Sequence, residues 1–135
     1  PELSAKGEDG SSLSVPFRHG GFIQMKGGKV FAEAVRSMVT SLNRVCQREQ
    51  LAVGDLHMVV PHQANQRILD GIAKRLGVDP KKIMTTLAKH GNTSAASIPL
   101  ALNQAFEEHR LAEGHLVLME AMGGGFTWGA VLARW

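Results

Sequence analysis

Segments with helical periodicity alternate along this chain with short apolar runs, and this alternation restricts the possible folds more than any other feature. The helical segments cover 29–50, 64–76 and 94–110, and the strand-like runs cover 56–60, 83–87, 116–122 and 126–133. Helices that alternate with strands favour an α/β fold with a mostly parallel sheet. We therefore predict an α/β fold.

Composition and length indicate a single globular domain. The chain has 135 residues, of which 44% are hydrophobic and 20% charged, a balance unlike that of disordered chains. A formal charge of +3 and few aromatic residues argue against a nucleic-acid partner. No apolar run reaches the length of a membrane span, and residues 1–28 lack the apolar block of a signal peptide. We expect no membrane partner and a cytoplasmic location, with residues 1–28, rich in glycine and serine, as an irregular connector.

Two polar motifs stand where strands would end and helices begin. His62 directly follows the strand-like run that ends at Pro61, and Asn92 stands in the motif 90–97. Ligands of open α/β sheets bind at this kind of junction. A histidine and an asparagine that converge there would present two hydrogen-bond donors to one developing negative oxygen, as in a thioester enolate or a tetrahedral acyl intermediate.

Each of these side chains also has a purely structural interpretation. His62 could cap helix amides or pack at the sheet edge, although a helix N-terminus would keep its imidazole neutral. Asn92 could cap the following helix, unless Thr93 or Ser94 does so and leaves its amide free. Asn65 is either a first-turn helix residue or a third polar group of the site.

A glycine triplet and a basic helix face each allow two interpretations. The glycines at 123–125 would relieve positive backbone angles in a hairpin, or let a backbone amide approach a substrate oxygen. Arg67 and Lys74 share a helix face, with Arg75 beside them. They form a solvated face paired with Asp70, or a docking stripe for phosphate or an acidic protein surface.

The single cysteine and the histidines form no recognisable nucleophilic or metal site. Cys46 excludes an internal disulfide, and it falls among the apolar positions of its helix, so we interpret it as a buried packing residue. A Cys46–His62 dyad is disfavoured because no strained turn or helix N-terminus surrounds Cys46. The histidines at 57, 90, 109 and 115 lack metal-ligand spacing, so we expect no metal.

Three ordered motifs carry a specific resemblance to a known family. Residues 62–68, 90–99 and 123–129 closely resemble the C-terminal part of β-ketoacyl-acyl carrier protein synthase III, and the similarity extends from about Lys29 to Trp135. The resemblance implies a thiolase-like half-domain over 29–135, a mixed and mostly parallel sheet with helices on both faces.

The resemblance also implies an activity. Synthase III enzymes start fatty-acid synthesis by a decarboxylating Claisen condensation of an acyl-CoA with malonyl-acyl carrier protein. By motif, His62 and Asn92 correspond to the catalytic pair that stabilises the thioester enolate, and the amide of Gly124 corresponds to an oxyanion-hole donor. Asn65 matches a motif asparagine near the cofactor tunnel. Coenzyme A thioesters and phosphopantetheine-bound groups would be substrates, with no covalently bound cofactor.

The implied partners are those of a complete synthase. Acyl carrier protein would dock on the basic helix that carries Arg67, Lys74 and Arg75. The N-terminal half of the synthase would supply the nucleophilic cysteine, and the complete enzyme would be a homodimer. No residue of this chain can replace that cysteine, so we expect an acyltransferase that is inactive as this chain alone.

Two further departures from the family pattern carry expectations. Ala32 stands where some members have a lysine, so carrier docking would depend more on Lys29 and Arg36. The resemblance implies a half-sheet with strand order 3-2-1-4-5, and we expect the chain to begin after the first strand, so that the central strand is missing between 56–60 and 116–122. Unpaired backbone groups would then line an open slot. Another chain, or the missing part of this protein, would fill that gap.

Two other functions stay open at this level. One is a non-catalytic module that binds a carrier protein or coenzyme A, since the nucleophile is absent. The other is a synthase III-like enzyme of secondary metabolism that uses other acyl groups.

Overall fold

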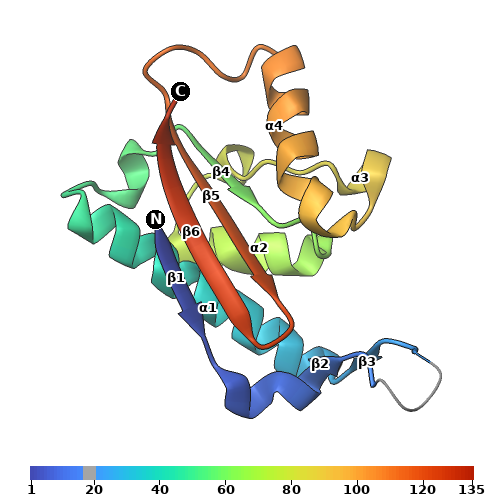
Figure 1. The fold of residues 1–135 in the computed structure, drawn as a ribbon. Coiled ribbons are helices and arrows are strands. Elements are labelled where there is room, and N and C mark those ends of the chain that lie inside the picture. Colours follow the sequence, from blue (N-terminus) through green and yellow to red (C-terminus); the bar gives the residue numbers. More distant parts are fainter. Residues whose placement is uncertain (17–20) are drawn as a thin grey trace.

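A four-stranded mixed sheet runs through the molecule and carries helices on both faces (Figure 1). The computed structural model describes residues 1–16 and 21–135, so the part of the expected connector at 17–20 lies outside the described residues. The strands are β1 (Glu2–Ala5), β2 (Leu13–Ser14), β3 (Gln24–Met25), β4 (Met58–Pro61), β5 (Leu116–Gly123) and β6 (Thr127–Arg134). The α-helices are α1 (Gly27–Arg48), α2 (Gln66–Leu76), α3 (Leu87–His90) and α4 (Ser97–Glu107), and the 3-10 helices are η1 (Gly7–Ser12), η2 (Val53–Asp55), η3 (Pro80–Lys82) and η4 (Ser94–Ala96).

The main sheet has the strand order β1-β6-β5-β4. Strand β4 runs parallel to β5, whereas β6 is antiparallel to both β5 and β1. A single parallel bridge joins Ile83 to Val59 beyond β4. The predicted α/β class and the mixed sheet with helices on both faces are confirmed.

The expectation of a missing central strand is wrong. Strands β4 and β5 pair directly, with Met58 opposite Val117 and Pro61 opposite Glu120, so no slot separates them. Parallel neighbours need a long crossover, and the segment with α2 and α4 provides one. The first strand of the chain, β1, instead lies at the edge of the sheet beside β6.

Two other segments differ from the predicted elements. The expected strand at 83–87 shrinks to the bridge at Ile83 and a bond from the backbone amide of Met84 to the carbonyl of Val59, at 2.8 Å. From Leu87 the chain is already helical. The expected connector contains β1, η1 and two short paired strands, so it is more regular than its composition indicates. A domain boundary at residue 28 stays a prediction.

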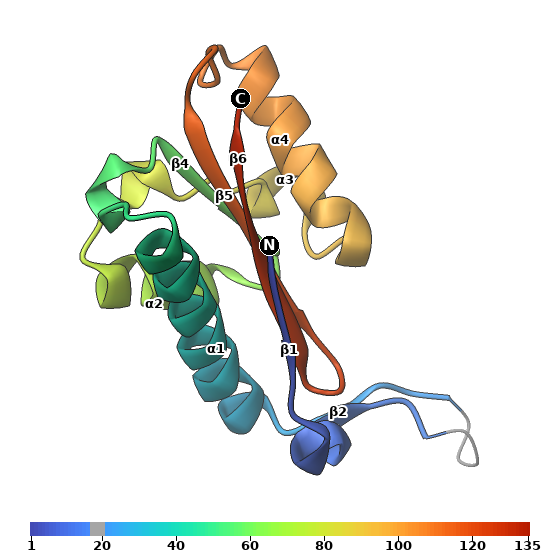
Figure 2. The same ribbon diagram turned by 60° about the vertical axis from the view of Figure 1, so that its left-hand side comes forward.

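The core has two layers, one on each face of the sheet. Helices α1 and α2 cover one face and α4 covers part of the other (Figure 2). Val59 packs toward α1 and α2, whereas its neighbours Met58 and Val60 pack toward α4. Because β4 is buried on both faces, its sequence is an unbroken apolar run rather than an alternating one. No helix among the described residues is long and apolar enough to cross a membrane.

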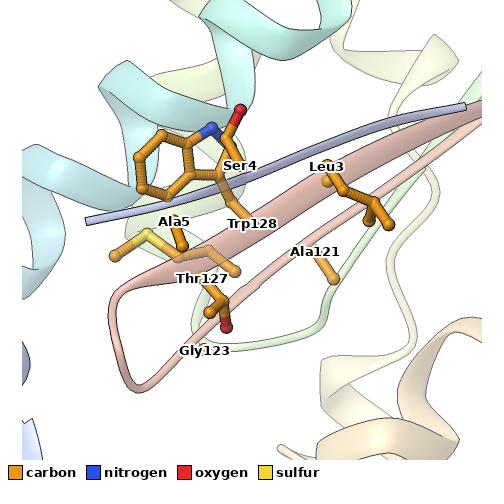
Figure 3. A pocket seen from close by; sticks show the side chains of 9 residues that line it. Leu3, Ser4, Ala5, Ala121, Gly123, Thr127 and Trp128 are labelled. Atoms are coloured by element: carbon orange, nitrogen blue, oxygen red, sulfur yellow. The ribbon is translucent and has the colours of Figure 1, made fainter. Parts of the chain in front are cut away.

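Helix α4 leaves the β6–β1 side of its sheet face uncovered. Leu3 of β1 is 84% exposed and Val131 of β6 is 40% exposed. Between these strands and the end of β5 lies an open hollow of about 580 Å³, whose lining includes Leu3, Ala121 and Thr127 (Figure 3). Its lining is mainly apolar, although it faces outward.

Candidate active site

His62 lies immediately beyond the carboxyl end of β4. Its backbone amide donates to the carbonyl of Glu120 at 2.7 Å, which extends the ladder by one bond after the strand ends. The imidazole is partly buried, and its Nδ1 lies 2.7 Å from Oγ of Ser97. Desolvation lowers the pKa of His62. The ring is therefore held in a fixed place and favours its neutral form.

Asn92 is presented by a glycine turn after α3. Gly91 has φ +63° and ψ −151°, a backbone conformation that essentially only glycine adopts. The Oδ1 atom of Asn92 accepts the backbone amide of Ser94 at 3.0 Å. Its side-chain Nδ2 has no hydrogen-bond partner among the described residues. The capping interpretation and the donor interpretation therefore use different atoms of one side chain.

The two side chains line one cavity of about 300 Å³. Asn65 lines it as well, and most of the remaining wall is apolar, from Leu13, Ile23, Met25, Val30, Ala34, Met38, Ala64, Ile68 and Met122. Gly123 completes the wall, whereas Gly124 lies in the turn beyond it and does not line the cavity. The structure thus brings His62, Asn92 and Asn65 together and leaves Gly124 outside this group.

Asn65 is the N-cap of α2, where its Oδ1 accepts the backbone amide of Ile68 at 3.1 Å. Asn65 therefore lies just before the first turn of α2 rather than within it, and it also lines the cavity. A second hollow of about 390 Å³ continues from it and is lined by Asn65 and Arg67. The two hollows also share Met25, Val30 and Ile68.

The basic face of α2 is exposed and has no internal counter-charge within the described residues. Arg67, Lys74 and Arg75 are all exposed. Asp70 does not pair with them as expected, and instead accepts a hydrogen bond from Gln66 at 2.9 Å.

The two other basic residues considered for docking are already paired. Lys29 binds the carboxylate of Asp9, and Arg36 binds that of Glu33. Lys6 contacts both carboxylates as well. Lys29 and Arg36 thus each have a carboxylate partner, whereas the basic residues of α2 have none among the described residues.

Gln63, which the sequence argument did not single out, joins the two loops of the site. It is fully buried, and its Nε2 donates to the carbonyls of Pro61 at 2.8 Å and Met84 at 3.1 Å. Its Oε1 accepts the backbone amide of Thr86 at 2.9 Å. Since α3 and Asn92 follow Thr86 directly, Gln63 ties the loop of His62 to the loop of Asn92. The only sequence signal is its place inside the motif 62–68.

Glu120, whose buried carboxyl lies beside the site, is a second residue that the sequence did not point to. It is 1% exposed on β5, and neither side-chain oxygen has a hydrogen-bond partner among the described residues. Burial raises its pKa to about 8, so the carboxyl is mostly protonated at neutral pH. The signal in the sequence is one glutamate inside the apolar run of β5.

Cys46 is buried in the core layer of α1, as predicted. Desolvation raises the pKa of its thiol, and the carboxyl groups of Asp55 and Glu120 raise it further. Such a thiol is a weak nucleophile at neutral pH. Within residues 1–16 and 21–135, no three His, Cys, Asp or Glu side chains are grouped so that they could hold a metal ion.

Comparison with known proteins places this geometry in a family. The family model for the C-terminal domain of 3-oxoacyl-[acyl-carrier-protein] synthase III matches residues 46–135. β-Ketoacyl-[acyl-carrier-protein] synthase III of Agrobacterium fabrum is 52% identical over 115 residues, which are 85% of this chain and 36% of that protein. The corresponding protein of Sodalis glossinidius is 44% identical over 138 residues, covering 98% of this chain and 44% of that protein.

Solved structures agree with the sequence comparison. The crystal structure of 3-oxoacyl-[acyl-carrier-protein] synthase III from Aquifex aeolicus superposes with a TM-score of 0.95 at 42% identity, over 99% of this chain and 43% of that one. The fold is therefore thiolase-like. More narrowly, the chain belongs to the C-terminal domain family of 3-oxoacyl-[acyl-carrier-protein] synthase III. It spans 36% of the length of the Agrobacterium relative and 44% of that from Sodalis.

Proposed function

We propose that this chain forms the histidine–asparagine side of the active site of a β-ketoacyl-acyl carrier protein synthase III. The observation that supports it best is the cavity lined by both His62 and Asn92, where Nδ2 of Asn92 has no partner among the described residues and can donate to a ligand. The names of the relatives agree with this class of acyltransferase in fatty-acid synthesis. We expect the protein to be cytoplasmic.

The proposed reaction needs two donors at one oxygen. Loss of carbon dioxide from a malonyl thioester leaves the electron pair of the broken carbon–carbon bond on the neighbouring carbon, and the negative charge moves onto the thioester oxygen. His62, as a neutral N–H donor, and the amide of Asn92 would stabilise that oxygen. The enolate carbon would then attack an acyl thioester on the enzyme and release its cysteine. The backbone amide of Gly124 would help to hold the oxygen of that acyl group.

Substrates would enter along α2. The hollow beside Arg67 continues into the cavity through Asn65 and the apolar residues that both share. A phosphopantetheine arm has a phosphate at one end and a long neutral chain, which suits a cationic mouth and an apolar passage. Arg67, Lys74 and Arg75, which have no ion-pair partner among the described residues, would form the docking surface for acyl carrier protein, and coenzyme A thioesters would use the same passage.

The chain would work only with the N-terminal half of the synthase. Its one cysteine, Cys46, is buried away from the cavity lining, so the nucleophile has to come from elsewhere. The apolar hollow around Leu3 and Thr127 gives that half a place to pack, because α4 leaves it uncovered. The complete enzyme, meaning this chain together with that half, would form a homodimer.

Decarboxylation of a malonyl thioester by the complete enzyme tests the catalytic proposal. His62→Ala should abolish most of the activity. Asn92→Asp is the sharper variant, because its carboxylate still accepts the amide of Ser94 but has no N–H to donate. We expect Asn92→Asp to lower kcat at least a hundredfold while the thermal midpoint changes little. Full activity in this variant would show that Asn92 serves only as a cap, and the catalytic proposal would then be wrong.

The second candidate is a non-catalytic module that binds a carrier protein, and the charges on α2, which have no ion-pair partner in the part of the chain that the structure describes, favour it. Charge reversal at Arg67 and Lys74 should weaken carrier binding at least tenfold under either function. Lys81→Glu, at an exposed lysine outside α2, is the control for general loss of positive charge. If carrier binding depends on the α2 charges and decarboxylation is unaffected by His62→Ala, the module interpretation holds instead.

A further inference from the structure

Ser97 contacts the loop of His62 at two points. It is the first residue of α4 and is 1% exposed. Its Oγ lies 2.7 Å from Nδ1 of His62 and accepts the backbone amide of Gln63 at 3.3 Å. Ser97 is therefore a buried hydroxyl held between a backbone donor and the imidazole.

The donors and acceptors at this hydroxyl fix the direction of the second bond. A serine hydroxyl has one proton to donate and two lone pairs. The amide of Gln63 can only donate, so it occupies a lone pair. No other acceptor for the Ser97 proton lies within hydrogen-bond reach among the described residues. If Nδ1 of His62 carried a proton, the buried hydroxyl would have no acceptor, which is unfavourable.

We propose that Ser97 is a positioning residue whose hydroxyl donates to Nδ1 of His62 and thereby keeps the imidazole in the tautomer with its proton on Nε2. The Nε2–H group then has no protein partner among the described residues and is available to a ligand. Only the purpose of this arrangement, donation to the enolate oxygen, rests on the proposed function. The tautomer itself follows from the hydrogen bonds.

Nitrogen-15 NMR of the full chain, labelled on histidine, tests the tautomer directly. His62→Gln assigns the ring signals. In the wild type at pH 7.5 we expect Nε2 to be protonated and Nδ1 to be an acceptor. In Ser97→Ala the ring should become a mixture of both tautomers, and the pKa of His62 should rise toward its ordinary value, because the neutral form loses its donor. Ser97→Thr, which restores a hydroxyl, should return the wild-type pattern.

Two results would overturn the proposal. One is a wild-type ring with its proton on Nδ1, a result that needs no variant to fold. The other is a pure Nε2–H ring in folded Ser97→Ala, because Ser97 would then not set the tautomer. Ser41→Ala is the matched control, since Ser41 is an equally buried helical serine, bonded to the carbonyl of Met38 on α1. It should leave the His62 signals unchanged.

Kinetics of the complete enzyme separate positioning from support of the fold. Ser97→Ala should lower kcat for malonyl decarboxylation about tenfold with KM nearly unchanged, and Ser97→Thr should recover most of it. A tenfold loss without any change of tautomer would make Ser97 merely structural and overturn the proposal. If His62→Ala has no effect on decarboxylation, the proposed function fails, while the tautomer measurement still decides the role of Ser97.

Discussion

Glu120 should make this chain less stable as the pH rises, because its carboxyl is buried and has no hydrogen-bond partner within residues 1–16 and 21–135. Below pH 4.5 both the folded and the unfolded chain carry the proton, and the burial involves no charge. Between pH 4.5 and about 8 the unfolded chain loses the proton and the folded chain keeps it, so the unfolded state is increasingly favoured. Above about pH 8 the loss is complete. The difference between the two pKa values corresponds to about 5 kcal/mol of unfolding free energy.

Glu120→Gln removes this dependence because an amide has nearly the shape of a protonated carboxyl and cannot ionise. We expect the variant and the wild type to have similar unfolding free energies at pH 4.5. At pH 9 the variant should be more stable by about 5 kcal/mol. Urea unfolding followed by circular dichroism across this range measures both free energies, and an unchanged m-value shows that the unfolded states are comparable.

An exposed carboxylate provides the control. Glu113→Gln changes the same group on the surface and should leave the stability curve nearly parallel to that of the wild type. If the curves of Glu120→Gln and the wild type also run parallel from pH 4.5 to 9, Glu120 does not titrate between the two states. The account of a neutral buried carboxyl would then be wrong.

Three further changes test other parts of the fold. Gly129→Ala should destabilise the chain by about 1–3 kcal/mol, because a Cβ would come within 2.7 Å of the carbonyl oxygen of Glu2. Hydrogen exchange should become faster in β1, and unchanged protection of β1 would contradict this close approach. Asp9→Asn should remove the contribution of Asp9 to the loss of stability as the pH falls from 3.8 to about 2, since the hydrogen bond from Lys29, above all, lowers the pKa of Asp9 to about 2. Acid unfolding measures this, and an unaltered acid transition would refute it. Gln63→Leu should lower the free energy of unfolding by about 3 kcal/mol or more, because two backbone carbonyls and one backbone amide lose their hydrogen-bond partner. Chemical unfolding measures this free energy. A loss well under 1 kcal/mol would mean that other groups replace these hydrogen bonds.

The helices and long strands could be predicted because their signals are local. Apolar spacing located α1 and α2, and the glycine triplet located the β5–β6 hairpin. The order of the strands could not be read in this way. β1 has the short sequence Glu2–Ala5 with little apolar character, and only its pairing with β6 makes it part of the sheet. The apolar residues at 83–87 satisfy a strand pattern, yet α3 begins at Leu87.

The site was predictable only where a motif carried it. His62 and Asn92 stand in motifs, and the structure places them around one cavity. Ser97 stands in a motif too, but its contact with His62 spans 35 residues of sequence and depends on where α4 docks. The absence of a hydrogen-bond partner for Glu120 among the described residues likewise depends on the packing around β5, and no local sequence pattern predicts that packing.

The side chain of Gln63 makes hydrogen bonds with backbone groups that a neighbouring strand would otherwise bind. Its carboxamide offers the same N–H and C=O groups as a peptide bond, and it meets Met84 and Thr86 two residues apart, as a neighbouring strand would. A glutamate at this position would keep the length and shape but would lose the donor to both carbonyls. One side-chain amide group therefore holds the loop after His62 against residues 84–86.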